Sequence, residues 1–184
     1  MKRILLSFII TNVLIFSTFG QESYIKARWN IKAGYSIYKT QFFSSSNTVN
    51  NNNYRLEINY GFRNKTETGV YAGYSRIMIY EPWTSGPPGS YVGSTVKAFF
   101  YGVNCNYHLL PLIIKEDDFR FDLYLTGKLG GISIERHGSQ PEYSIGGGLA
   151  FYLFKHIGPF IEYSYGKFYY NDHKKIRYGL SLTF

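Results

Sequence analysis

The sequence has little of what stabilises most small helical or disulfide-linked proteins. Its 184 residues include one cysteine, which excludes an intramolecular disulfide framework and a multi-cysteine zinc site. Only five alanines follow residue 20, against 18 glycines, and this ratio disfavours a helical bundle. Charged residues make up 17% of the chain, whereas soluble domains average about 25%. No apolar run reaches the roughly 18 residues that a membrane-spanning helix needs. Aromatic residues, by contrast, reach 20%.

The first twenty residues have the pattern of a secretory signal peptide. Lys2 and Arg3 precede a mostly apolar stretch, residues 4–16, which is followed by small residues suited to cleavage. The apolar stretch is too short to cross a bilayer as a helix. We therefore predict that residues 1–20 are removed and that residues 21–184 form a single exported domain.

Beyond this segment, apolar and polar side chains alternate with a period of two, as on strands whose successive side chains point to opposite faces. The clearest run, residues 119–128, reads FRFDLYLTGK. Seven further runs repeat the pattern, and no segment shows convincing helical periodicity. The eight predicted strands lie at residues 25–37, 54–62, 69–80, 99–108, 119–128, 143–151, 161–166 and 176–184.

Short turns and longer polar loops alternate between these strands. The turns are expected at residues 64–67, 110–118 and 155–158. The loops, rich in Ser, Asn, Gly and Pro, are expected at residues 39–53, 81–94, 134–141 and 167–174. This arrangement is typical of an up-and-down meander closed into a barrel. The sequence therefore predicts an all-β fold, an eight-stranded antiparallel up-and-down β-barrel.

The composition of the two faces distinguishes a membrane barrel from a soluble, ligand-carrying barrel such as a lipocalin. A soluble barrel needs an outer face dense in Lys and Glu. Here the polar face is mostly Gly, Ser, Thr and Asn with few charges, which suits a narrow interior. The apolar face carries aromatic rings near the strand ends, for example Trp29, Tyr107 and Phe184, as expected at a bilayer interface. We therefore predict a transmembrane β-barrel.

The last strand, RYGLSLTF (residues 177–184), resembles the C-terminal signature of bacterial outer-membrane barrels, because its apolar residues alternate and it ends in Phe. With GPFIEYSYG (158–166) and RFDLYLTGKLG (120–130), it is similar to strands of the small OmpA- and OmpX-like outer-membrane barrel proteins. The resemblance implies an integral outer-membrane location with periplasmic termini and extracellular loops. It implies little about activity, since that group shares architecture rather than chemistry. It also implies that the assembly machinery recognises Tyr178, Leu180, Leu182 and Phe184.

The polar face carries charges of both signs, which are expected to point into the barrel. An eight-stranded barrel has room only for side chains, and buried charges must be paired, so we expect an ion-pair network. Bases outnumber acids in this set, which leaves a small anion channel as an alternative. The expected lumen residues are Lys26, Arg28, Lys32, Arg55, Glu57, Arg120, Asp122, Lys128, Glu162 and Arg177.

Two bases, Arg76 and Lys97, interrupt the apolar face near the loop ends of the third and fourth strands. Hairpin pairing would bring them together at the outer interface, where we expect contacts with lipopolysaccharide phosphates. Ordinary snorkelling, or a local shift in the alternation, is the competing interpretation.

An enzyme that modifies lipid A is the remaining alternative. His137-Gly138-Ser139 resembles the His-x-Ser element of the lipid A deacylase family. However, the segment falls in a predicted loop, and Phe151 stands where that family has an acid. We therefore expect no enzymatic activity and no catalytic residues.

The sequence thus predicts a monomeric, non-enzymatic outer-membrane barrel that maintains the envelope or makes surface contacts through its loops. The histidines show no metal-ligand spacing, so neither a metal nor a cofactor is expected. No basic cluster with stacking aromatics stands apart from the strands, so nucleic acid is not an expected partner. The expected partners are outer-membrane lipids, lipopolysaccharide and the outer-membrane assembly machinery.

Overall fold

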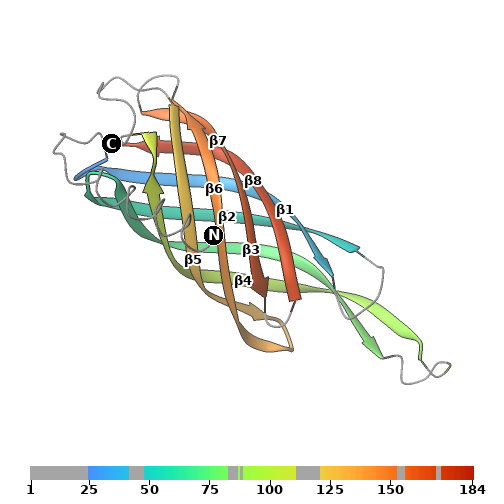
Figure 1. The fold of residues 1–184 in the computed structure, drawn as a ribbon. Coiled ribbons are helices and arrows are strands. Elements are labelled where there is room, and N and C mark those ends of the chain that lie inside the picture. Colours follow the sequence, from blue (N-terminus) through green and yellow to red (C-terminus); the bar gives the residue numbers. More distant parts are fainter. Residues whose placement is uncertain are drawn as a thin grey trace, which may run out of the picture.

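The computed structural model describes residues 25–41, 48–82, 87, 89–110, 121–152, 156–168 and 171–184. Eight strands form one closed barrel, in which each strand pairs antiparallel with the next and the last pairs with the first (Figure 1). The predicted fold class is therefore confirmed, while the predicted signal peptide lies outside the described residues. The strands are β1 (Trp29–Gln41), β2 (Thr48–Arg63), β3 (Thr66–Pro82), β4 (Tyr91–His108), β5 (Phe121–Ile134), β6 (Gly138–Phe151), β7 (Ile157–Phe168) and β8 (Asn171–Thr183).

The side chains alternate between the two faces of the barrel wall, with apolar residues outside. On β2, Tyr54 and Leu56 are 64% and 46% exposed. The residues that alternate with them, Arg55 and Glu57, are 3% and 0% exposed. This distribution is the reverse of that in a water-soluble barrel, and it follows from the period-two pattern of the sequence. Within the described residues, no helix is long and apolar enough to cross a membrane.

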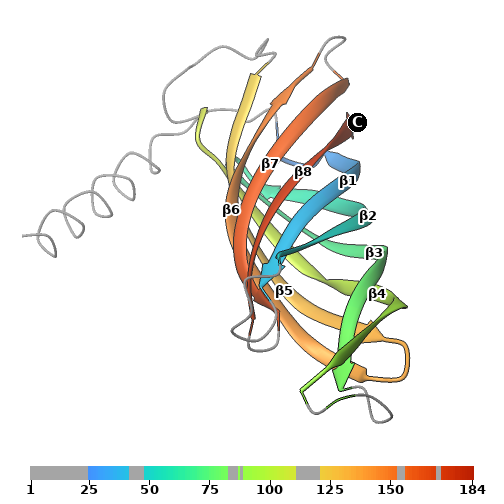
Figure 2. The ribbon, with the colours of Figure 1, turned by 90° about the vertical axis from the view of Figure 1, so that its right-hand side faces the viewer.

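The two ends of the barrel differ. At one end, which we call the terminal end, Trp29 and Phe184 exchange backbone hydrogen bonds of 2.8 and 3.0 Å. The β1–β2, β3–β4, β5–β6 and β7–β8 hairpins close at the opposite end, which we call the distal end. Strands β3 and β4 extend farthest at the distal end, beyond the rest of the wall (Figures 1 and 2).

The strands reach further into the predicted loops than the sequence analysis expected. Within 39–53 and 81–94, β1 continues to Gln41, β2 starts at Thr48, β3 runs to Pro82 and β4 starts at Tyr91. The asparagine tract therefore belongs largely to β2. The loop predicted at 134–141 was wrong, because a tight turn at 135–137 joins β5 to β6 there. These strand ends were not predicted because their side chains are polar and do not alternate with apolar ones. The hydrogen bonds of the sheet join backbone groups, so polar side chains do not prevent pairing.

The first strand begins at Trp29, because the preceding residues form a turn that ends the alternation. Ala27 has a φ of 62°, and its amide donates a 2.7 Å hydrogen bond to the carbonyl of Gly61. Ile25 is buried against this contact, at 5% exposure. A side chain at Gly61 would place its Cβ 1.9 Å from the Ile25 carbonyl oxygen, so glycine is required for the close approach.

Candidate functional site: the ion-pair network in the barrel interior

Seven of the ten predicted lumen residues lie inside the barrel, each at most 5% exposed. Lys26 and Arg28 do not, and their placement in the lumen was wrong. Both are exposed at the terminal end, because the turn before β1 removes them from the strand alternation. Arg120 lies outside the described residues. The buried members are Lys32, Arg55, Glu57, Asp122, Lys128, Glu162 and Arg177.

Five further Glu, His and Lys side chains, which the predicted lumen set did not include, are buried in the interior. Each continues the alternation of an inward-facing strand residue. Glu67 is four residues from the inward-facing Tyr71, and Glu142 is two residues from the inward-facing Ser144, so both fall on the same face as their neighbour. Extending the alternation into the strand ends would have found them. The five are Glu67, His108, Glu142, His173 and Lys175.

The described interior carries equal numbers of acidic and basic side chains, histidines aside. The acids are Glu57, Glu67, Asp122, Glu142 and Glu162. The bases are Lys32, Arg55, Lys128, Lys175 and Arg177. The excess of bases that suggested an anion path is therefore absent from the part of the lumen that the structure describes.

A central cluster joins four strands across the lumen. Lys128 Nζ on β5 lies 2.7 Å from a carboxylate oxygen of Glu57 on β2 and also contacts Glu162 on β7. Arg177 on β8 donates to Glu57, and its Nη1 lies 3.7 Å from Glu162. Each acid thus meets two bases, so neither charge is left alone in a low-dielectric interior.

A second cluster lies toward the distal end. Arg55 Nη2 and Lys175 Nζ each lie 3.0 Å from a carboxylate oxygen of Glu142. The Tyr71 hydroxyl donates to the same carboxylate at 3.4 Å, and the Arg55 guanidinium stands 4.3 Å from the Tyr71 ring centroid. The aromatic ring therefore supports the cation as well as filling volume.

A third cluster lies toward the terminal end. Glu67 Oε1 lies 3.3 Å from Lys32 Nζ and accepts a 2.7 Å hydrogen bond from the side-chain amide of Asn106. The His108 ring lies between two carboxylates, with Nδ1 2.8 Å from Asp122 and Nε2 3.6 Å from Glu67. These contacts connect β1, β3, β4 and β5, so the interior charges cross-link the wall over its whole length.

Apolar side chains flank the charged interior at both ends. In the middle, Tyr124 is 0% exposed, and Lys32 Nζ stands 3.7 Å from its ring centroid. Toward the distal end the apolar cluster comprises Tyr71, Ile77, Val96, Ala98, Phe100, Ile132 and Ile134. Toward the terminal end it comprises Ala150, Tyr152 and Phe160. Packed side chains and ion pairs therefore occupy the described interior, as expected for a barrel of eight strands.

On the outer surface, the register places Arg76 on β3 directly opposite Lys97 on β4, and both are exposed. The paired rings of Tyr74 and Phe99 lie two positions nearer the middle of the wall. The backbone amide of Lys97 donates to the Glu135 carboxylate at 3.3 Å. The two bases are therefore adjacent, next to aromatic residues and close to one acid.

The other sequence-predicted groups lie apart from the network. The predicted assembly signal on β8 faces outward, with Tyr178, Leu180, Leu182 and Phe184 between 41% and 57% exposed. His137 is in the β5–β6 turn. Its Nδ1 lies 3.1 Å from the Glu135 carbonyl oxygen, which accepts a hydrogen bond when Nδ1 carries the proton. Among the described residues, no group of three His, Cys, Asp or Glu side chains could hold a metal ion.

Comparison with known proteins identifies the fold. No protein-family model matches the chain, and no curated protein sequence matches it. Neisserial surface protein A matches with a TM-score of 0.60 at 13% identity, covering 86% of this chain and all of that one. OprG from Pseudomonas aeruginosa matches with a TM-score of 0.60 at 10% identity, covering 90% of this chain and 99% of that one.

The attachment invasion locus protein Ail of Yersinia pestis is also similar, with a TM-score of 0.51 at 16% identity over 86% of this chain and 99% of that one. The fold is thus that of the small eight-stranded outer-membrane barrels. At these identities the likeness defines the architecture and leaves the biochemical role to be argued from the residues.

Proposed function

We propose that this protein is an integral, non-enzymatic barrel of the bacterial outer membrane that supports the envelope and offers a contact surface at its distal end. The termini are periplasmic in this proposal and the distal hairpins extracellular. The observation that carries it is the reversed distribution of side chains, with a continuous apolar wall outside and paired charges inside.

An outer wall of this kind is incompatible with water. The outward side chains of all eight strands include large apolar residues that are at least 38% exposed. Soluble monomers rarely expose contiguous apolar patches beyond a few hundred Å². In a bilayer the same wall is favourable, because a closed barrel satisfies its backbone hydrogen bonds internally.

The interior supports a structural role. Its described acids and bases are equal in number and are held in clusters that join opposite strands. A conducting pore would instead need a continuous hydrated path through the interior. Two of the similar proteins are Neisserial surface protein A and the attachment invasion locus protein Ail, and their names are consistent with a surface-contact role for the distal end.

Cell fractionation with heat-modifiable gel migration tests the location and the fold together. We expect the folded protein in the outer-membrane fraction, with a band that shifts on boiling. Protease treatment of intact cells should cleave only at the distal hairpins. Recovery of a monodisperse protein from the periplasm without detergent would contradict the proposal, as would cleavage at the terminal end in intact cells.

Conductance and envelope assays test the role. In planar bilayers the purified barrel should show no resolvable single-channel steps, and steady anion-selective steps would favour the channel. A deletion strain should become more sensitive to detergents, or lose binding to surfaces, without a change in the lipid A mass spectrum. A lipid A mass change that depends on His137 would overturn the non-enzymatic proposal.

A further inference from the structure

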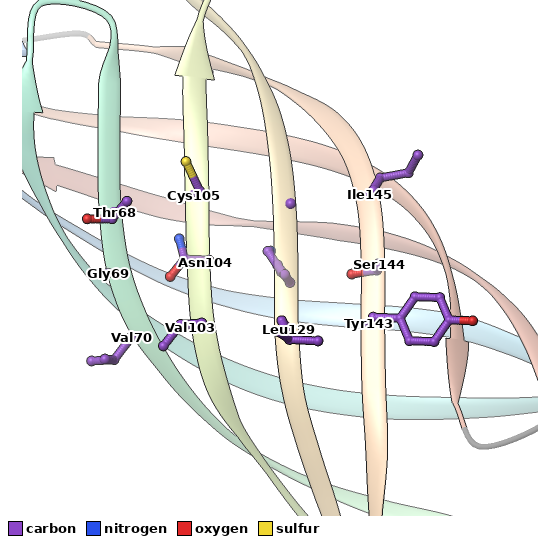
Figure 3. Close-up of a pocket in the computed structure, with 12 residues that line it drawn as sticks. Thr68, Gly69, Val70, Val103, Asn104, Cys105, Leu129, Tyr143, Ser144 and Ile145 are labelled. Atoms are coloured by element: carbon purple, nitrogen blue, oxygen red, sulfur yellow. The ribbon is translucent and has the colours of Figure 1, made fainter.

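The part of the outer wall that the structure describes contains an apolar groove. It has a volume of about 600 Å³ and crosses β3, β4, β5 and β6 (Figure 3). One row of the lining pairs across the four strands and consists of Val70, Val103, Leu129 and Tyr143. The neighbouring row consists of Thr68, Cys105, Gly127 and Ile145. The groove is therefore hollowed into the face that meets hydrocarbon in the proposed function.

A missing side chain creates the depression. The outward positions of β5 read Leu125, Gly127 and Leu129, so glycine interrupts a row of leucines. A Cβ added at Gly127 would meet nothing within 4 Å, whereas most glycines of the wall approach backbone atoms closely. Gly127 pairs with Cys105 on β4 and with Ile145 on β6, and these side chains border the gap.

The width of the groove matches one hydrocarbon chain. β4 and β6 flank β5 at about 4.8 Å on each side, and Cys105 and Ile145 stand on those two strands. An α-helix with its side chains is about 10–12 Å across, too wide to reach the floor at Gly127. A single extended acyl chain reaches it and gains van der Waals contacts on three sides.

The distal rim of the groove carries a positive charge. Tyr143, which lines the groove, pairs across β6 and β7 with Lys167. Lys167 Nζ lies 3.8 Å from Asp172 Oδ1, and the two side chains are about half exposed, at 48% and 53%. Such an exposed pair is weak, so Lys167 remains able to bind a phosphate, while the Tyr143 ring suits the interface below it.

We propose that this groove binds lipopolysaccharide, with one acyl chain of lipid A lying over Gly127 and a lipid A phosphate at Lys167. The inference rests on the proposed outer-membrane function, which places the distal end in the outer leaflet. Charge at the rim and an apolar, chain-wide floor below it specify an anionic lipid rather than a protein. Because lipid surrounds the barrel everywhere, selectivity comes from shape and from the phosphate contact rather than from hydrophobic burial.

Lipid retention by the barrel purified from outer membranes tests this site. Native mass spectrometry in mild detergent counts lipopolysaccharide, phosphatidylglycerol and phosphatidylethanolamine on each folded barrel. Gly127→Leu fills the groove, and Ala33→Leu places the same leucine side chain at an exposed outward position on β1. Lys167→Gln removes the rim charge, and Lys26→Gln removes an exposed base at the terminal end, far from the groove.

We expect one lipopolysaccharide on the wild-type protein, on Ala33→Leu and on Lys26→Gln. Retention should fall about tenfold in Gly127→Leu, equivalent to about 1.4 kcal/mol, and severalfold in Lys167→Gln. Equal retention by Gly127→Leu and Ala33→Leu would overturn the site, and so would a phospholipid as the retained molecule. Formation of a Cys105-linked dimer when the membranes are oxidised would show that a second copy of this chain occupies the groove, and would also overturn the lipid site.

The same preparations separate this inference from the proposed function. Each variant is checked for outer-membrane fractionation and heat-modifiable migration before its lipids are counted. A wild-type barrel absent from the outer membrane defeats the proposed function. A barrel present there with unselective retention defeats only the lipid site.

Discussion

Replacing Glu57 with glutamine removes one charge from the centre of the buried network while keeping the shape of the side chain. Glu57 is fully buried and accepts from both Lys128, at 2.7 Å, and Arg177. In the variant the two bases retain only Glu162 between them, since both also contact that acid. A positive charge is then left uncompensated in an interior from which water is largely excluded.

Breaking a buried ion pair by removing one partner costs about 3–5 kcal/mol. Tenfold in an equilibrium constant corresponds to about 1.4 kcal/mol, so the unfolding constant should rise by roughly two to three and a half orders of magnitude. An exposed ion pair contributes at most about 1 kcal/mol. Asp172→Asn removes the acid of such a pair, whose Nζ–Oδ1 distance is 3.8 Å, and serves as the matched control.

Urea titration of the folded barrel in phospholipid vesicles, followed by the heat-modifiable band and by tryptophan fluorescence, measures the difference. We expect a clear shift of the midpoint for Glu57→Gln and little shift for Asp172→Asn. Adding Arg177→Met to Glu57→Gln should recover part of the loss, because it removes the excess positive charge and leaves Lys128 paired with Glu162. Equal small shifts in both single variants would show that water screens the lumen, and would refute the reasoning.

Two further predictions concern the wall. Gly148→Val should destabilise the folded barrel by about 1–3 kcal/mol, because a Cβ there lies 2.4 Å from the buried Tyr124 ring. Gly127→Ala has open space around its Cβ, so it should leave the stability unchanged or raise it in the same urea titration. Charge removal from both Arg76 and Lys97 should weaken binding of the barrel to lipid A vesicles in low salt, with little effect on vesicles lacking phosphate. Unchanged binding would assign the pair to ordinary snorkelling.

The strand count and the two faces were predictable because one simple rule governs them. A barrel wall with different solvents on its two sides imposes a period of two, and residues 119–128 show it without interruption. The period of two does not, however, determine that every inward residue is polar. Ile77, which the alternation placed on the polar face, is 2% exposed in the distal apolar cluster, so the interior is not polar throughout.

The predicted site was incomplete for a related reason. Glu67 and Glu142 stand at strand positions that the sequence analysis assigned to a turn and to the neighbourhood of a loop, yet ladder pairing continues through both. Lys26 was misplaced for the opposite reason, since the positive φ of Ala27, 62°, ends the alternation without any signal in the residue types. Pairings across the lumen, such as Arg177 with Glu57, depend on barrel closure and are not encoded in local spacing.

Depth-dependent fluorescence quenching tests most directly which face of the wall meets hydrocarbon. A probe on the native Cys105, an outward position, is compared with one on Ser144→Cys in a Cys105→Ser background, an inward position. Nitroxides at the bilayer centre should quench the first probe strongly and the second weakly. Strong quenching from the inward position alone, or aqueous quenchers acting on Cys105, would contradict the assignment of the two faces.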